Sequence, residues 1–257
     1  MKKLIYLILI ILSITLFLFI FIPLFKMIIS ANPKLITDAL ADKEIVSAIL
    51  LSFKCALIAT TIALIAGIPL SFYLARYDFP FKSLVEAVLD IPVMIPHTAV
   101  GIALLTVFGS RFFLGKLFNS IGIDFVGTEF GIIIGMMYVS LSYLINHAKS
   151  GFKNVDPKLE KAARTLGASS LKTFFYVTLP LAKNDILSGA IMMWARGLSE
   201  FGAVVILAYH PMTAPVLILE RFQSYGLNYS KPIAVLLILI CIVLFTLLRW
   251  VNNRKKY

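Results

Sequence analysis

Residues 155–180, VDPKLEKAARTLGASSLKTFFYVTLP, form the longest polar stretch in a chain that is otherwise strongly apolar. Two short helical patterns meet in this stretch at Gly167, a residue that permits a sharp break. Asp156 is placed to cap the first helix, and Ser169 or Ser170 is placed to cap the second. We therefore expect two short helices joined by a glycine elbow, and we call residues 155–180 the connecting segment.

The composition around this segment is that of a membrane protein. Of the 257 residues, 60% are hydrophobic and 14% are charged, with a mean hydropathy of +0.94, which predicts a polytopic membrane protein. The net charge of +11 is carried mainly at the ends of apolar runs, which points to membrane orientation and away from nucleic-acid binding. Cys55 and Cys241 lie inside apolar runs, so neither a disulfide framework nor a metal site is indicated.

Six apolar runs are long enough to cross a bilayer core of about 30 Å as helices. They cover residues 4–25, 48–75, 84–108, 130–147, 186–208 and 232–250. The first run follows Lys2 and Lys3, as a signal peptide would, but it is too long for a signal core and has no small-residue cleavage site. We expect an all-α protein with six transmembrane helices, one transmembrane domain over residues 1–257 and a polar loop at about 149–184.

The distribution of lysine and arginine predicts the orientation. With six spans both termini lie on one side, together with the connecting segment, and the cations outside the spans are concentrated on that side. The positive-inside rule then predicts a protein of the cell membrane whose termini and connecting segment lie in the cytoplasm.

The third predicted span reads LDIPVMIPHTAVG, with Asp90 followed by Pro92 and Pro96. Proline removes a backbone donor and bends a helix, which is tolerated in a membrane where protein or a water-filled cavity satisfies the freed carbonyls. A bent helix that lines a pore and a bend that serves packing alone both fit this pattern. His97, which follows, and His147 lack the companion spacing of a metal site, and we interpret both as packing residues.

The fifth predicted span contains WARGLSEFGAVV, which places Arg196 and Glu200 on one helical face. Charges at membrane depth are costly and should face the bundle interior or water. They could form an ion pair that holds the fold, or they could line a translocation path. Asp90 is an alternative partner for Arg196, and the sequence does not choose between these pairings.

The sequence holds no nucleotide-binding loop and no recognisable catalytic or metal-binding motif, so no catalytic residue, metal or cofactor is predicted. If a nucleotide drives this protein, its hydrolysis must take place on another chain. The cations of the connecting segment could hold it on anionic lipid. However, Ala162 and Ala163 give its first helix a small apolar face, which suits close docking into the groove of a partner protein better than burial in lipid.

The connecting segment resembles the EAA cytoplasmic loop of ABC importer permeases, which has the pattern E-A-A-x3-G-x9-I-x-L-P. The matching residues are Lys161, Ala162, Ala163, Gly167, Val177, Leu179 and Pro180. Lys161 stands where the family usually has glutamate, Glu160 lies one position earlier, and Val177 replaces isoleucine. The resemblance implies that Glu160 and the seven matching residues couple the chain to an ATPase.

The resemblance extends over the whole chain, whose six spans fit the type I permease plan. DIPVMIPHTAVGIALL and ARGLSEFGAVVILAYHPMTAPVLILERF are most similar to the tungstate/molybdate type within the molybdate, tungstate and sulfate branch. This implies a homodimeric pore, two copies of a cytoplasmic ATPase that grip the connecting segments, and an outer binding protein that delivers the oxyanion. ATP-driven closure of the ATPases would then open the pore outward.

Two other classes of function are alternatives for a polytopic membrane protein. An ion-coupled secondary transporter could use Asp90, Arg196 and Glu200 as a relay, but such carriers often show two transmembrane repeats, and the sequence has no obvious paired repeat. A membrane scaffold or a membrane enzyme without a transport role is the other class. The sequence shows no catalytic constellation in favour of it. Co-purification with a soluble ATPase separates the permease from both.

Overall fold

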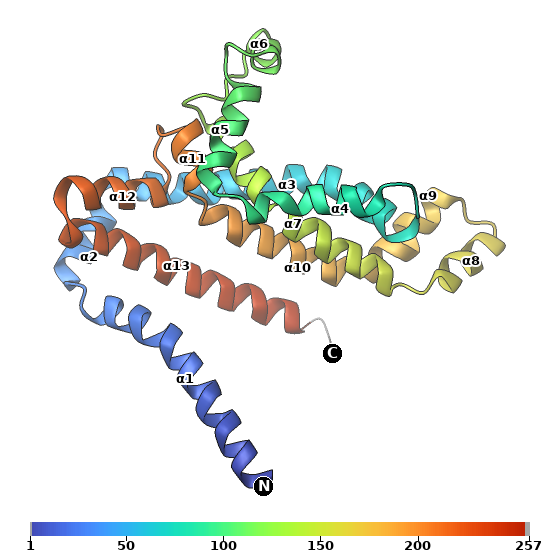
Figure 1. The fold of residues 1–257 in the computed structure, drawn as a ribbon, viewed down its shortest axis with the longest axis horizontal. Helices are drawn as coiled ribbons and strands as arrows, with labels where there is room; N and C mark the ends of the chain where they lie inside the picture. The colour runs from blue at the N-terminus through green and yellow to red at the C-terminus, as the bar shows by residue number, and fades with distance from the viewer. Residues whose placement is uncertain (1, 255–257) are drawn as a thin grey trace. The chain divides into compact units, whose positions relative to one another are not determined.

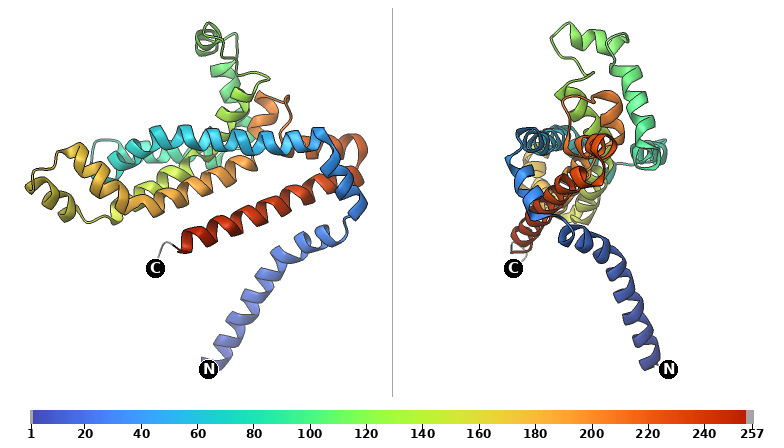
Figure 2. Two further views of the ribbon diagram at one scale, coloured as in Figure 1. Left: turned by 180° about the vertical axis from the view of Figure 1, so that it is seen from behind. Right: turned by 90° about the vertical axis from the view of Figure 1, so that its left-hand side faces the viewer.

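The computed structural model describes residues 2–254, and within this range it contains helices and no strand. The predicted all-α class is therefore confirmed. The chain divides into two compact units, one made of residues 48–216 and the other made of the residues up to 47 and from 217 on. Figures 1 and 2 show the helices of both.

The smaller unit is built from α1 (Lys2–Ile29), α2 (Pro33–Ala41) and α13 (Leu227–Arg254), with α13 in contact with both other helices. The side chain of Asn32 caps α2 by accepting a hydrogen bond from the backbone N–H of Lys34 at 3.0 Å. From Ile5 on, α1 is highly apolar and unburied, as expected of a helix that faces lipid. This unit contains the first and last predicted spans.

The larger unit is organised around α7 (Glu129–Asn154), which packs against α10 (Leu179–Leu198) and α3 (Lys43–Arg76). Glycine brings α10 very close to α7, because a Cβ at Gly189 would lie 2.7 Å from the Cβ of His147 and 3.1 Å from the carbonyl oxygen of Leu144. The three helices run alongside one another in Figures 1 and 2. They form the scaffold on which the polar sites are placed.

The predicted third span is two helices, α4 (Lys82–Met94) and α5 (His97–Phe108), bent by 114° at a short break. Ile95 is extended, as a residue before proline prefers to be, and Pro96 occupies the N-cap position of α5. Pro92 is buried inside α4. The bend expected from the two prolines is present, and it lies at Pro96.

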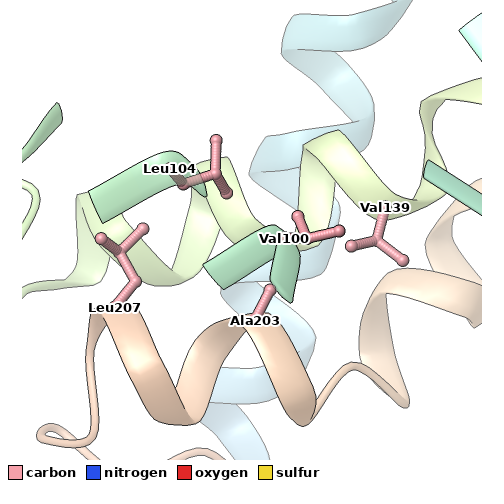
Figure 3. Packing of buried hydrophobic residues seen from close by; sticks show 5 residues of the cluster. All are labelled: Val100, Leu104, Val139, Ala203 and Leu207. Carbon is pink, nitrogen blue, oxygen red and sulfur yellow. The ribbon is translucent and has the colours of Figure 1, made fainter. Parts of the chain in front are cut away.

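The fifth predicted span is also broken. It consists of α10 and α11 (Gly202–Leu207), and α11 packs against α5 and α7. Figure 3 shows the buried cluster that joins the three helices. Its members are Val100 and Leu104 of α5, Val139 of α7, and Ala203 and Leu207 of α11.

Four described helices are long and apolar enough to cross a membrane: α1, α3, α7 and α13. The bent α4 and α5 count as a fifth if they form one span. α10 has 20 residues but carries Lys183, Asp185 and Arg196, and it does not meet the same test. The short helices α6 (Phe113–Asn119) and α12 (Ala214–Tyr225) lie between spans. The chain is a multi-pass membrane protein, and the sixth span stays a prediction.

Candidate functional site

The connecting segment folds as α8 (Pro157–Thr165), α9 (Ser170–Thr173) and a π-helical turn, η1 (Phe174–Thr178), which leads into α10. Asp156 Oδ1 accepts a hydrogen bond from the N–H of Lys158 at 2.8 Å, and Ser169 Oγ accepts one from the N–H of Lys172 at 3.3 Å. Both predicted caps are therefore present, with Ser169 as the cap of the second helix. The segment lies at one end of the α7 and α10 pair (Figure 1).

Gly167 forms the elbow between the two helices. Its φ of +90° lies in the left-handed region, where glycine is favoured over other residues. Its N–H donates to the carbonyl of Arg164 at 2.9 Å, and the N–H of Ala168 donates to the carbonyl of Ala163 at 3.0 Å, which satisfies carbonyls at the end of α8. The expected glycine elbow is confirmed by this geometry.

Two faces of α8 differ sharply in exposure. Lys158, Lys161 and Ala162 are exposed, Ala163 is half-buried, and Glu160 is buried with 7% of its surface exposed. One helical turn therefore directs a lysine and a small alanine outward while it directs a carboxylate inward. Of the residues that match the EAA pattern, Lys161 and Ala162 are the ones most open to a partner on this helix.

Glu160 contacts the end of α3, far away in the sequence. Its Oε1 accepts hydrogen bonds from Arg76 Nε at 3.1 Å, from Arg76 Nη2 at 2.8 Å and from Thr178 Oγ1 at 3.0 Å. Arg76 Nη2 also donates to the carbonyl oxygen of Val155 at 2.9 Å. Only 12% of the Arg76 side chain and 9% of the Glu160 side chain are exposed, so this is a buried ion pair with additional hydrogen bonds.

An aromatic cluster lies beside this ion pair. Phe72 of α3 packs edge-on against Phe152 of α7, with ring centroids 5.4 Å apart, and against Phe174 of η1 at 5.0 Å. Leu179, at the start of α10, packs against the same buried group, whereas Val177 is half-buried and Pro180 is exposed. The second half of the connecting segment is thus held to α3 and α7 by apolar packing.

A second polar site lies where the two helix breaks meet. Glu200, in the break between α10 and α11, is fully buried, and its Oε2 lies 3.1 Å from Arg196 Nη2 and 2.9 Å from His97 Nδ1. Its Oε1 accepts a hydrogen bond from the N–H of Ala203 at 2.8 Å, which anchors the start of α11. Arg196 Nη2 also lies 2.7 Å from His97 Nδ1. We call His97, Arg196 and Glu200 the charge cluster.

The partner of Asp90 is Asn146, whose Nδ2 donates to Asp90 Oδ1 at 2.7 Å. Both side chains line a pocket of about 300 Å³ between α4 and α7. The alternative that the sequence left open is therefore decided, with Arg196 joined to Glu200 and Asp90 joined to Asn146. His147 lines the same pocket, and its Nδ1 lies 2.9 Å from the carbonyl oxygen of Tyr143, in keeping with a satisfied packing residue.

The interpretation of His97 as a packing residue misses its contacts with both members of the ion pair. The histidine opens α5 directly after the Pro96 break, and a Cβ at Gly202 would lie 2.7 Å from the His97 Cβ. This close approach brings the histidine to Glu200. The only sequence signal was its position next to a proline in an apolar run. Among the residues that the structure describes, no group of acidic, histidine and cysteine side chains is suited to hold a metal ion.

The comparison with protein families identifies the class to which this chain belongs. Residues 67–257 match the family described as the inner membrane component of binding-protein-dependent transport systems, and the chain belongs to this family. The predicted class of protein is thereby confirmed.

The relatives within the family narrow the class to one type of permease. The chain is 46% identical to the molybdate/tungstate transport system permease protein WtpB of Methanocaldococcus jannaschii, over 91% of this chain and 92% of that protein. It is 45% identical to the WtpB of Pyrococcus abyssi, over 87% of this chain and 85% of that protein. A probable sulfate transport system permease of Chlorokybus atmophyticus is 31% identical, over 88% of this chain and 81% of that protein.

Solved structures support the fold independently of sequence. A bacterial ABC transporter that imports the acidic polysaccharide alginate superposes with a TM-score of 0.76 at 15% identity, over 98% of this chain and 96% of that chain. The MetNI methionine ABC transporter superposes with a TM-score of 0.61 at 13% identity, over 82% of this chain and 94% of that chain. The chain therefore has the fold of an ABC importer permease.

Proposed function

We propose that this chain forms the pore of an ATP-driven importer of molybdate or tungstate. Two copies of the chain would form the pore, a binding protein outside the membrane would deliver the oxyanion, and two ATPase subunits would bind on the cytoplasmic side. Both termini would lie in the cytoplasm, and residues 1–257 would act as one permease domain. The observation that carries this proposal is the outward face of α8, held firmly on the transmembrane helices in a chain that belongs to the permease family.

The exposed face of α8 indicates what kind of ATPase surface would receive it. Lys158 and Lys161 lie one turn apart and are exposed beside Ala162, whereas the nearby carboxylate of Glu160 is taken up by Arg76. The alanine would let the backbone of α8 approach a groove closely. The lysines would need carboxylates along the edge of that groove. We infer that the ATPase groove is acidic where it meets Lys161, whereas a permease with glutamate at this position would require a basic one. Gly167, Val177, Leu179 and Pro180 would hold the docked helix in place.

For the membrane interior we propose that the bend at Pro92 and Pro96 and the charge cluster shape the pore. Glu200 is fully buried and contacts Arg196. These two observations favour a structural ion pair that fixes the two helix breaks, and they argue against an exposed anion site. Asp90 forms its hydrogen bond with Asn146, which is not a member of this pair, and this argues against a continuous proton relay through the three charged residues. The secondary transporter is the weaker alternative for this reason.

The proposal is tested in vesicles that contain the purified chain, its ATPase and the oxyanion-loaded binding protein. We expect uptake of molybdate and tungstate that requires ATP and all three components. Sulfate, tested in parallel, defines the selectivity. Uptake that continued without ATP or the ATPase and followed a proton gradient would contradict the permease function and favour the secondary transporter.

The acidic groove has its own test. Lys161→Glu should weaken co-purification of the ATPase at least tenfold, because a cation at the interface becomes an anion opposite carboxylates. Lys183→Glu makes the same charge change at an exposed position in α10, outside α8, and should leave binding within about twofold. Equal binding by the two variants would argue against docking through this face of α8.

A further inference from the structure

We propose that Arg76 is a positioning residue for coupling, which holds the cytoplasmic end of α3 to α8 through Glu160. The helix α3 would then move with the ATPase, in addition to α7 and α10, which the connecting segment joins directly. This inference rests on the proposed docking of the ATPase on α8.

Arg76 and its partner Glu160 together join three separate parts of the chain. Arg76 is the last residue of α3, Glu160 lies in α8, and Thr178 ends η1. A single carboxylate oxygen of Glu160 receives both the guanidinium and the Thr178 hydroxyl, and the guanidinium also reaches the carbonyl of Val155 at the end of α7. Each of these bonds is directional, so the three parts are fixed in orientation as well as in distance.

The surroundings favour a persistent contact. Both side chains are largely removed from water, where an ion pair is screened less than at a surface. Phe72, one turn before Arg76, packs against Phe152 and Phe174, so an apolar contact supports the polar one. Asp78 is the acid closest to Arg76 in the sequence, and it forms an ion pair with Lys82. The Nζ of Lys82 lies 2.8 Å from Asp78 Oδ1, and its hydrogen bond lowers the pKa of Asp78. No competing carboxylate in this loop therefore draws Arg76 away.

The chain connectivity explains why this contact matters for coupling. The backbone of the connecting segment runs directly into α7 at one end and α10 at the other, so both must follow its motion. Arg76, in contrast, is 84 residues from Glu160, and α3 is joined to α8 only by side-chain contacts. The middle of α3 also packs against α7, through Ala63 and Leu144, and can be carried along by that helix. Arg76 ties the last turn of α3 directly to α8, and so keeps this end of α3 in step with the docked helix.

The first test removes the ion pair without leaving a lone buried charge. The double variant Arg76→Met with Glu160→Gln should fold and retain the ATPase, but its uptake per ATP hydrolysed should fall at least tenfold. The matched control is Lys149→Met with Glu86→Gln. It removes an ion pair between α7 and α4, in which Lys149 Nζ lies 3.2 Å from Glu86 Oε1, and which does not involve α8. The control should stay within about twofold of the unmodified protein. A fully coupled double variant would overturn the proposal.

The second test follows the distance directly and does not depend on a variant of the ion pair. Spin labels are placed at the exposed positions Tyr77 and Leu166, after Cys55 and Cys241 are replaced by serine. In the full transporter with the ion pair intact, the label distance should keep one narrow distribution with and without ATP. A distance that changes with ATP would show that α3 does not follow α8 and would overturn the inference. Failure of the proposed function is distinguishable, because the unmodified chain would then not bind an ATPase at all.

Discussion

The packing of α10 on α7 through Gly189 gives a sharp prediction about stability. An alanine at this position would place its Cβ 2.7 Å from His147 Cβ, 3.1 Å from the carbonyl oxygen of Leu144 and 3.3 Å from Leu144 Cα. Two of these three neighbours are backbone atoms of α7, which no side-chain rotation can move. The helices must therefore separate locally for Gly189→Ala to fit.

The size of the effect follows from these distances. Carbon atoms in good contact lie about 3.5–4.0 Å apart, so the helices would have to separate by roughly 1 Å at this point. Overpacking of this kind costs about 1–3 kcal/mol, and the better helix propensity of alanine offsets about 1 kcal/mol. We expect a net loss of about 0–2 kcal/mol in the free energy of unfolding, or up to about 8 °C in Tm for a chain of this size.

The assay is thermal unfolding of the purified protein in detergent, with Gly197→Ala as the matched control. Gly197 lies in the same helix, but a Cβ there would lie 3.6 Å from the Met136 Cβ, which is ordinary contact. The control should therefore unfold at the same temperature as the parent or slightly above it. If Gly189→Ala were as stable as Gly197→Ala, the reasoning about close backbone approach between α7 and α10 would be wrong.

Two further predictions concern the sites themselves. Gly167→Val should lower uptake per ATP hydrolysed at least tenfold, because valine is strained at a φ of +90°, and normal coupling in this variant would count against the elbow as part of docking. Arg196→Met should lower the yield of folded protein because it removes a cation from the fully buried Glu200, and Arg196→Met with Glu200→Gln should restore the yield. A well-folded Arg196→Met protein that does not transport would favour a pore-lining arginine instead.

The parts of the structure that the sequence predicts well are those set by local chemistry. The Asp156 cap involves residues two positions apart, the elbow needs only glycine at position 167, and the bend before α5 follows from Pro96. Each is decided by the conformational preferences of one or two neighbouring residues. The four long apolar helices α1, α3, α7 and α13 follow in the same way from the lengths of the apolar runs.

The parts that the sequence does not predict depend on contacts between distant residues. The break between α10 and α11 carries no proline. It forms where Glu200 turns back to the N–H of Ala203 and reaches His97 of another helix, so the sequence suggested one span over 186–208. Glu160 adjoins the EAA pattern, and its position alone predicts a docking residue. Its inward direction depends on Arg76, which no local pattern connects to it.

The two polar sites of the larger unit are connected by one rigid helix. α10 begins at the connecting segment and ends two residues after Arg196, with 20 residues and a length of about 30 Å. Its close contact with α7 at Gly189 leaves little room for the two helices to slide past one another. A displacement at the start of α10 would therefore reach the charge cluster as a movement of the whole helix pair. There it meets the break before α11 and the bend before α5, the places where the fifth and third predicted spans depart from a continuous helix. The helix α10 is thus stiff between the two sites, and the backbone is broken at the charge cluster. A lever that opens a pore needs both properties.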